Sequence, residues 1–524
     1  MEFYYPIPQN VTKSKVVYDC DKCKLKDKAK SPVIKPVVGS DYNGIVILGQ
    51  YPSKEDDRNN RAFSDGRSSI FLSNARKQGI NLVKQAAWLF AASCYNPSKP
   101  SDTHFKCCRN ILKENLEQLK PKLIICCGEY AFKYLFNIKE KNAISKLRNR
   151  FIPNYEFNCI VFPVYDPYDF KMYRGDKMDN YYHHTYKWDL ERCFKAYKNK
   201  FSKQREVNKF LLERRILENI SIKQITTMEE AKDVFAHVNS LNEICLDYET
   251  TSLKPHDNNF SIVYTALGTG KEAWVFHESF WLKSNKQRDF FYQQMISLLE
   301  NKKIRKVIQN AYYEELCSRY FFGIKKINNV FCTLIATHIV DEREGTKSQD
   351  FQNLVRFGIP PYSEKIKKYL ITDKKNDEEI ETDDGVEFVY QKQNKIREAP
   401  VKDLVEYNGL DVITCMNNYM VLNDLLLDNY EKQRECYNFF LEGQMLFADM
   451  SEKGVPIHKP KFDEFKSRIY EEITKVEDKI KNLPSIIEYN DFLTAKKEAE
   501  ATKDDKELKK LMKKVKPKRR ITLK

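Results

Sequence analysis

The residues Ile244-Cys245-Leu246-Asp247-Tyr248-Glu249 place a short apolar run directly before two carboxylates. Alternate side chains of a β-strand project from the same face of the sheet, so we expect Asp247 and Glu249 to lie side by side. Neighbouring carboxylates of this kind can bind metal ions together. Because Asp-x-Glu triplets also occur by chance at solvated strand ends, the site depends on further acidic residues elsewhere in the chain.

Two later segments supply such residues. The run Lys306–Asn310 predicts a short strand that leads into a helix carrying Tyr313 and Glu314. Further along, Tyr407 and Asp411 are four positions apart in Tyr-Asn-Gly-Leu-Asp, which on a helix places both side chains on one face. Acidic side chains thus occur in three separate segments of the chain.

In this order and at these separations, the segments resemble the exonuclease I, II and III motifs of the DEDDy proofreading exonucleases, which accompany family A DNA polymerases. The resemblance covers about 220–430 and implies a ribonuclease H-like (DnaQ-like) fold and 3'-5' exonuclease activity. It implies two Mg²⁺ or Mn²⁺ ions on Asp247, Glu249 and Asp411, whose hard oxygen ligands suit these cations. It also implies that Tyr407 orients the attacking water.

One motif departs from the family. Where the family has Asn-x-x-Phe-Asp, this chain has Asn310-Ala311-Tyr312-Tyr313-Glu314, and the glutamate is longer by one methylene. The longer side chain would reduce activity unless the helix is set back to compensate. We count Glu314 among the catalytic residues and expect an active enzyme. By the same resemblance, Thr250, Leu253 and Asn310 line the site for the terminal nucleotide.

The pattern of apolar runs predicts an α/β protein with several domains. Runs at 45–48, 123–127 and 160–164 alternate with helical patterns such as 108–119, which indicates a mainly parallel sheet. Runs at 243–248, 261–267 and 273–277 have short links, which favours a mixed sheet. The expected domains are an N-terminal α/β domain over 1–199, a basic helical connector over 200–219, the exonuclease domain over 220–430 and a helical region over 431–524. The polar segment 372–396 is expected to form a surface hairpin or loop.

Four cysteines predict a metal site in the N-terminal domain. Cys20 and Cys23 form a short Cys-x-x-Cys turn, and Cys94 and Cys108 follow later. Four thiolates can hold a zinc ion or a [4Fe-4S] cluster, and their spacing does not choose between the two. Cys107 competes with Cys108 for the fourth position.

The segments around these cysteines resemble the iron-sulfur (family 4) uracil-DNA glycosylases from Cys20 to about Phe170. The resemblance rests on the segments Ile47–Pro52, Arg61–Phe63, Ser93–Pro97, Cys108–Leu112 and Lys120–Gly128. It implies a [4Fe-4S] cluster, with zinc as the alternative, and the match to Cys-Arg-x-x-Leu favours Cys108 as the fourth ligand.

The positions that carry glycosylase chemistry in that family have changed in this chain. Gln50 stands in place of the acidic residue, Phe90 in place of the asparagine that reads uracil and Asp166 in place of the histidine. A glycosylase must stabilise the departing uracil anion, which an aspartate would repel. We predict a DNA-binding or structural domain without uracil excision, in which Phe63 is either a stacking platform for a base or a core aromatic residue.

The C-terminal part resembles the segment that joins exonuclease and polymerase in family A enzymes and leads into the thumb. The resemblance rests on Gln444–Met450 and Lys453–Ile457. In that family the palm aspartates come later, so we expect no polymerase activity from this chain alone and a palm on a second chain, or a truncated product. The order of domains is similar to that of DNA polymerases from large bacterial viruses (bacteriophages).

Composition sets the class of partner. The 524 residues carry a formal net charge of +15, which favours a polyanionic partner, here DNA with a single-stranded 3' end or a primer-template. No run approaches the roughly 20 apolar residues of a membrane-spanning helix, and no membrane partner is expected. The segment Met1–Asn10 lacks the features of an export signal, so we expect a cytoplasmic protein (in the host cytoplasm if it is viral) whose cysteines remain thiols.

The sequence thus favours a metal-dependent 3'-5' exodeoxyribonuclease that proofreads within a split or truncated family A polymerase. One alternative is a non-catalytic module for DNA binding or replisome assembly. The other is an active uracil-DNA glycosylase, which the changes at Gln50, Phe90 and Asp166 disfavour.

Overall fold

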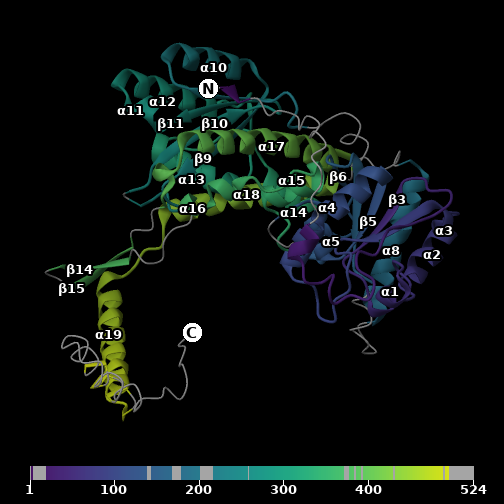
Figure 1. The fold of residues 1–524 in the computed structure, drawn as a ribbon. Coiled ribbons are helices and arrows are strands. Elements are labelled where there is room, and N and C mark those ends of the chain that lie inside the picture. The colour runs from purple at the N-terminus through teal and green to yellow at the C-terminus, as the bar shows by residue number, and fades with distance from the viewer. Residues whose placement is uncertain are drawn as a thin grey trace. The chain divides into compact units, whose positions relative to one another are not determined.

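The computed structural model describes residues 2–3, 19–138, 143–167, 179–200, 216–257, 259–370, 377–382, 385–390, 394–428, 431–484, 486–487, 490–491 and 493–494 (Figure 1). The chain forms two compact units, Met1–Glu452 and Lys453–Lys524. The first unit contains two large sheets, which are the centres of two domains, and a small two-stranded hairpin.

A six-stranded sheet forms the centre of the N-terminal domain. Its strands, in spatial order, are β2 (Val37–Val38), β4 (Ala86–Phe90), β3 (Ile45–Gly49), β5 (Leu123–Cys127), β7 (Cys159–Val164) and β6 (Ile152–Asn154). The four central strands are parallel and the two edge strands are antiparallel to their neighbours. The expected mainly parallel sheet is therefore confirmed.

Helices cover both faces of this sheet, which explains the continuous apolar runs of its strands. Val46 and Leu48 of β3 point into one core, while Ile45 and Ile47 point into the other. The helical elements are η1 (Asp19–Lys22), α1 (Lys54–Asn59), α2 (Ser68–Lys77), α3 (Leu82–Gln85), α4 (Asp102–Leu119), α5 (Glu129–Leu135), α6 (Ile144–Leu147) and α8 (Asp179–Lys198).

A seven-stranded mixed sheet forms the second domain, as its short links predicted. The strands, in spatial order, are β1 (Glu2–Phe3), β8 (Ser221–Ile225), β11 (Glu272–His277), β10 (Ile262–Gly268), β9 (Glu243–Thr250), β12 (Arg305–Ile308) and β13 (Val330–Cys332). Strand β10 is antiparallel to both of its neighbours, β9 and β11, whereas β12 runs parallel to β9. Strand β12 ends at Ile308 rather than at Asn310, because Asn310 is already the N-cap of the next helix.

Helices pack around this second sheet. They are α10 (Met228–Ser240), α11 (Glu278–Leu282), α12 (Asn285–Glu300), α13 (Ala311–Phe322), α14 (Thr333–Val340), α15 (Gln349–Phe357), α16 (Lys367–Leu370), α17 (Val401–Asp428) and α18 (Glu431–Lys453), with the short turns η2 (Ser363–Lys365) and η3 (Ile396–Glu398). Helix α17 lies across β8, β9, β10 and β11. This crossing brings the segment around Asp411 onto the strand that carries Asp247.

Helix α18 is fastened to the same unit. The Arg319 guanidinium of α13 is almost fully buried and pairs with Asp449 at 2.7 Å and Glu452 at 2.8 Å. The hydroxyl of Tyr437, also on α18, accepts a hydrogen bond from the Cys332 backbone N–H at 2.8 Å. These contacts attach α18 to the second domain, within the first compact unit.

The remaining expectations concern the linking and C-terminal segments. The polar segment around 372–396 contains a hairpin of β14 (Asp377–Thr382) and β15 (Gly385–Tyr390), as expected. The second unit contains helix α19 (Lys459–Lys481). Most of the expected connector, 201–215, lies outside the described residues. Within the described part of the chain, we find no helix with the length and apolar character needed to cross a bilayer.

Candidate functional site

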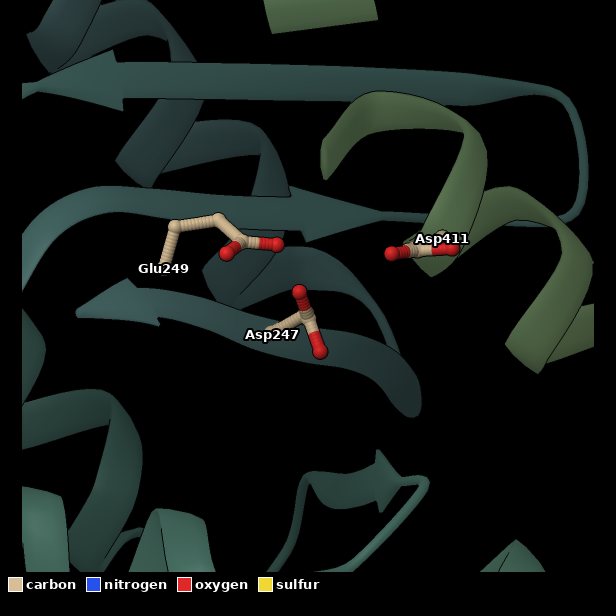
Figure 2. A group of neighbouring side chains, drawn as sticks. All are labelled: Asp247, Glu249 and Asp411. Carbon is tan, nitrogen blue, oxygen red and sulfur yellow. The ribbon is translucent and has the colours of Figure 1, made fainter. Parts of the chain in front are cut away.

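Three carboxylates from two elements meet at the end of strand β9. Asp247 and Glu249 project from the same face of β9, and Asp411 reaches them from α17 (Figure 2). One oxygen from each of the three side chains lies within 4.8 Å of the others. The structure therefore brings together the three residues that the sequence predicted as metal ligands.

A glycine allows α17 to approach the sheet closely enough for this. A Cβ atom on Gly409 would lie 2.4 Å from Cγ2 of Ile222, a distance that real Cβ contacts do not show. The helix can therefore lie close to β8 only because position 409 has no side chain. Gly409 is the central residue of the Tyr-Asn-Gly-Leu-Asp motif, so the motif contains both the functional side chains and the residue that positions their helix.

Three polar residues hold the carboxylates, and the sequence did not point to them. Asn408 donates a hydrogen bond from Nδ2 to Oδ2 of Asp247 at 2.6 Å. The Tyr362 hydroxyl donates to Oδ1 of Asp411 at 2.5 Å, and Gln349 Nε2 donates to the same oxygen at 3.3 Å. Asn408 lies within the motif and could have been suspected, whereas Tyr362 and Gln349 lie 49 and 62 positions from Asp411 in segments without a recognisable pattern.

Glu314 lies beside this group but is not one of its three members. It is 5% exposed on α13, and its charge raises the pKa of Asp247. Burial raises the pKa of Glu314 itself to about 8. Its Oε2 and the Oδ1 of Asn408 are buried without a hydrogen-bond partner among the described residues. Unpartnered buried oxygens are rare in proteins, and here they flank the carboxylate group.

The electrostatics of the site favour a bound cation. Burial raises the pKa of Asp247, Glu249 and Asp411 well above the usual range, and repulsion from neighbouring carboxylates, including Glu314, raises it further. An excess of buried negative charge is costly unless positive charge compensates it. All three side chains offer carboxylate oxygens, and such ligands suit Mg²⁺ or Mn²⁺.

Tyr407 lies on the same helix as Asp411, one turn earlier. The negative charge of Asp411, followed by burial, raises the pKa of Tyr407, so its hydroxyl stays protonated at neutral pH. That hydroxyl forms a hydrogen bond with Asp411 that opposes the rise in the carboxyl pKa. The tyrosine is thus a neutral hydrogen-bond donor at the edge of the acidic group.

The three residues expected around the terminal nucleotide have different environments. Thr250 is buried; its Oγ1 donates to the Ser252 carbonyl at 3.0 Å and also contacts the Tyr313 hydroxyl. Leu253 is 80% exposed. Oδ1 of Asn310 accepts a hydrogen bond from Gln444 Nε2 of α18 at 3.3 Å. Of the three, Leu253 has the free surface that a stacked base could cover.

The four predicted cysteines come together in the N-terminal domain. Burial raises the pKa of Cys108 to about 12, and the nearby thiols of Cys94, Cys23 and Cys20 raise it too. The backbone N–H of Val33 donates to Sγ of Cys94 at 3.2 Å. Val33 has a φ of 56°, which is unusual for a β-branched residue. This strained turn points a donor at a sulfur atom, as expected where the thiol is a charged ligand.

Cys107 lies beside the same group. It packs with Cys23, Leu25 and Cys94 in a small buried cluster, whereas Cys108 belongs to the larger core of the domain. None of the fourteen cysteines, all of which lie in the described residues, forms a disulfide. The four thiols fit a zinc ion or an iron-sulfur cluster. Cys107 and Cys108 both lie close to Cys94 and Cys23, so mutation of each can show which one is the fourth ligand.

The region that corresponds to the glycosylase base pocket is filled by the protein's own side chains. The ring of Phe90 stacks on Phe63 with a centroid separation of 4.9 Å and an angle of 10°. The Arg67 guanidinium lies over both rings, 5.2 Å from the Phe63 centroid and 5.4 Å from that of Phe90. Phe63 is therefore already covered on its stacking face.

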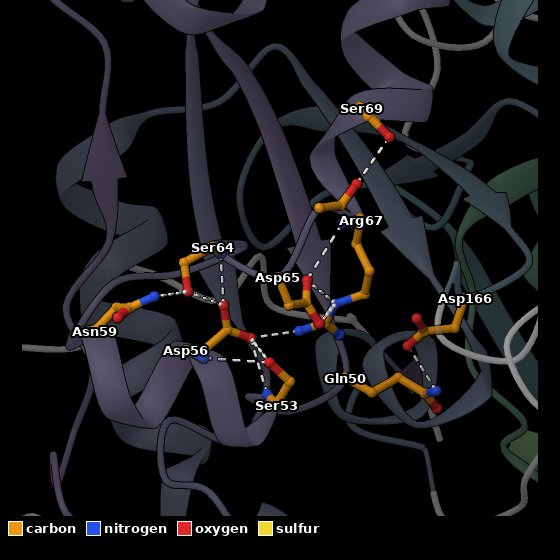
Figure 3. A network of polar contacts seen from close by, with 10 residues as sticks. Gln50, Ser53, Asp56, Asn59, Ser64, Asp65, Arg67, Ser69 and Asp166 are labelled. Atoms are coloured by element: carbon orange, nitrogen blue, oxygen red, sulfur yellow. Dashed lines mark hydrogen bonds and ion pairs between the residues drawn. The ribbon is translucent and has the colours of Figure 1, made fainter.

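Polar contacts close the rest of this pocket (Figure 3). Gln50 Nε2 donates to Oδ2 of Asp166 at 2.9 Å, and Gln50 Oε1 accepts from the Tyr130 backbone N–H at 3.1 Å. Arg67 is buried and pairs with Asp56 and Asp65. Sequence reasoning identified the changes at Gln50, Phe90 and Asp166 but missed Arg67, whose role depends on contacts with residues that have no fixed spacing from it.

Two known protein families match this chain, one over the N-terminal domain and the other over the second domain. The profile of the Uracil DNA glycosylase superfamily matches residues 36–188, and that of the 3'-5' exonuclease family matches residues 222–426. The chain therefore contains a uracil-DNA glycosylase superfamily domain followed by a 3'-5' exonuclease domain, and its fold is α/β with two mixed sheets and a C-terminal helical region.

Individual proteins are similar to parts of the chain. The type-4 uracil-DNA glycosylase of Sulfurisphaera tokodaii is 27% identical over 158 residues, which cover 29% of this chain and 70% of that protein. The corresponding enzyme of Saccharolobus solfataricus is 27% identical over 159 residues, with coverages of 29% and 72%. Among solved structures, Brucella melitensis NrnC aligns with 42% of this chain and 92% of its own, at 16% identity and a TM-score of 0.29. Escherichia coli RNase D aligns with 42% of this chain and 50% of its own, at 13% identity and a TM-score of 0.29.

Proposed function

We propose that this protein is a metal-dependent exonuclease that removes nucleotides from the 3' end of DNA, with a proofreading role beside a family A polymerase palm. The observation that carries the proposal is the convergence of Asp247, Glu249 and Asp411 on one point at the end of β9. A match to an exonuclease family over 222–426 supports the reaction class. The net charge of +15 supports a nucleic-acid substrate.

The residues divide the work of hydrolysis. Asp247, Glu249 and Asp411 would hold two divalent cations, which when bound lower the pKa of water and stabilise the leaving oxygen. Tyr407, which stays protonated, is placed to hydrogen-bond and orient the attacking water. Water oxygen joins phosphorus while the bond from phosphorus to the 3' oxygen of the preceding nucleotide breaks. The proton passes to that oxygen, and a nucleoside 5'-monophosphate leaves.

A first test is direct. A 5'-labelled single-stranded DNA incubated with the protein and Mg²⁺ should shorten from its 3' end in one-nucleotide steps. Chelation with EDTA should abolish the shortening, and added Mn²⁺ should restore it. An RNA strand of the same sequence, run in parallel, measures the preference for DNA. A strand that stays intact with either metal would refute the proposal.

We further propose that the N-terminal domain binds DNA or supports the fold without excising uracil. The stack of Phe90 on Phe63 occupies the face that a base would need. The hydrogen bond from Gln50 fixes Asp166 in the pocket, where its charge would oppose a departing uracil anion.

A uracil-containing oligonucleotide should therefore remain free of abasic sites after incubation with the protein. The expected rate is that of a sample without protein, because opening the pocket would require separating two stacked rings in the core. Alkaline cleavage after incubation measures the product, with a type-4 uracil-DNA glycosylase as positive control and EDTA to silence the nuclease. Strand breaks at uracil above the background would contradict this assignment.

A further inference from the structure

Helix α15 joins the two domains, and its two faces have different partners. It begins after Ser348, whose Oγ accepts a hydrogen bond from the Phe351 N–H, and ends at Gly358 with a φ of 65°. One face is apolar and the other is polar. The helix contacts β6 of the N-terminal domain and α17 of the exonuclease domain (Figure 1).

The apolar face completes a core of the N-terminal domain. Phe351, Leu354 and Val355 are buried in the same cluster as Val46 and Leu48 of β3. Leu354 is 1% exposed. These residues come from the exonuclease half of the sequence, so the glycosylase-like domain needs α15 to bury its own apolar surface.

Further contacts fix the end of the helix and the segment before it against β6 and its neighbours. The Arg150 guanidinium lies 5.4 Å from the centre of the Phe351 ring and also pairs with Asp341. A Cβ atom at Gly358 would lie 2.1 Å from the carbonyl oxygen of Pro153 in β6. The helix end therefore lies directly against the backbone of the N-terminal domain.

The polar face of α15 and the turn after it bind the segment that carries Asp411. Gln349 Nε2 donates to the Asp411 carbonyl at 2.8 Å and to Thr414 Oγ1 at 2.8 Å. Asn353 donates to Thr414 Oγ1 at 3.1 Å and accepts from Asn418 at 2.7 Å. These hydrogen bonds hold one turn of α17 against α15.

Tyr362 completes this network at the carboxylate itself. Its hydroxyl donates to Oδ1 of Asp411 at 2.5 Å and lies 3.1 Å from Thr414 Oγ1. Its ring packs beside that of Tyr407 with a centroid separation of 5.8 Å. With Oδ1 engaged by Tyr362 and Gln349, rotation of the Asp411 carboxylate is restricted.

We propose that Tyr362 and Gln349 are positioning residues for Asp411 and that the glycosylase-like domain, through α15, sets the metal affinity of the exonuclease site. The proposal rests on the proposed exonuclease function, because Asp411 must be a metal ligand for its orientation to matter. Residues that orient metal ligands typically change metal affinity or activity by about 10- to 100-fold when removed. The retained domain is then a structural part of the nuclease rather than an independent enzyme.

The hydroxyl of Tyr362 can be tested against a matched tyrosine. In the full chain, Tyr362→Phe should raise the Mn²⁺ dissociation constant measured by calorimetry about tenfold, and lower kcat while KM for the DNA strand stays within twofold. Tyr437→Phe is the control. It also removes a tyrosine hydroxyl, but that hydroxyl accepts a hydrogen bond from the Cys332 backbone N–H at 2.8 Å and makes no hydrogen bond to the three carboxylates. The control should keep the Mn²⁺ affinity of the unchanged protein.

The domain link can be tested on the opposite face of α15. Leu354→Ala should raise the Mn²⁺ dissociation constant about threefold or more, although Leu354 faces the N-terminal core. Leu190→Ala, in the second core of that domain, removes an equally buried leucine from a cluster that contains no residue of α15. It should lower thermal stability by a similar amount and leave Mn²⁺ binding unchanged. If Leu354→Ala does not fold, Leu354→Val makes the same comparison with a smaller cavity.

The outcomes separate the hypotheses. Absence of Mn²⁺ binding and DNA hydrolysis in the unchanged protein would overturn the proposed exonuclease function. Normal activity of the unchanged protein, together with unaltered Mn²⁺ affinity in Tyr362→Phe, would overturn the positioning role. A weakened Tyr362→Phe beside an unaltered Leu354→Ala would overturn the contribution of the glycosylase-like domain.

Discussion

Replacing Asp247 with asparagine should reduce 3' shortening of a DNA strand at least about a thousandfold, a loss of about 4 kcal/mol of transition-state stabilisation. Asparagine keeps the shape of the side chain and an oxygen for the hydrogen bond from Asn408, so the fold should survive. It removes one of the three charges that converge on the cation position. Single-turnover rates at saturating Mg²⁺ provide the measurement.

The same variant should be more stable than the unchanged protein in EDTA, where no cation offsets the repulsion. Burial and the neighbouring acids raise the pKa values of these carboxyl groups, and that of Glu314 reaches about 8. For Glu314, whose pKa rises from 4.5 to about 8, the contribution to stability is fully present below pH 4.5 and is lost as pH rises through 8. The raised pKa of Asp247 acts in the same direction. The advantage of Asp247→Asn, measured by thermal unfolding, should therefore grow from pH 5 to pH 8.

A matched control separates charge at the site from charge in general. Asp233→Asn changes an exposed aspartate on α10 of the same domain and should leave both rate and stability nearly unchanged. Shortening by Asp247→Asn at the rate of the control would rule out the assignment of Asp247 as a metal ligand.

Replacing Cys108 with serine should remove the metal group that we propose for the four cysteines of the N-terminal domain. If the group is an iron-sulfur cluster, the broad visible absorbance of the purified protein should disappear. Because the free energy of metal binding contributes directly to folding, the unfolding temperature of this domain should fall by about 10 °C or more. Iron, sulfide and zinc analysis of the unchanged protein would distinguish the cluster from a zinc ion.

Cys107→Ser is the matched comparison, because Cys107 is the alternative to Cys108 as the fourth ligand. Cys107 is adjacent to Cys108 and equally buried, so the serine costs a similar loss of packing. Its absorbance and metal content should match those of the unchanged protein. The reverse result, with Cys107→Ser colourless and Cys108→Ser coloured, would exchange the two residues as the fourth ligand.

The sequence predicted those parts of the molecule that depend on local periodicity or on short spacings. The pair Asp247 and Glu249 follows from the alternation of a strand, and Tyr407 with Asp411 from one turn of a helix. Their convergence followed from the family resemblance. Strands β3, β5 and β7 of the first sheet and β9 to β12 of the second were expected, because buried strands have continuous apolar runs that can be recognised without a partner. The remaining strands of both sheets, among them β4 and β8, were not expected.

What the sequence did not reveal depends on contacts between distant residues. Tyr362 and Gln349 bind Asp411 across 49 and 62 positions, and no spacing rule connects them. The closing of the glycosylase-like pocket required the ring of Phe90 to be seen against Phe63, since a sequence shows a substitution but not the space that it fills. The family resemblance identified the altered positions, and the structure showed that together they fill the pocket.

The shared helix α15 also sets an order for synthesis on the ribosome. The strands of the N-terminal sheet end at Val164, but the leucine and phenylalanine that complete one of its cores belong to Gln349–Phe357. At translation rates of about 5–20 residues per second, this apolar surface stays uncovered for about 10–40 seconds. The nascent N-terminal domain therefore exposes part of its core until the exonuclease half has emerged.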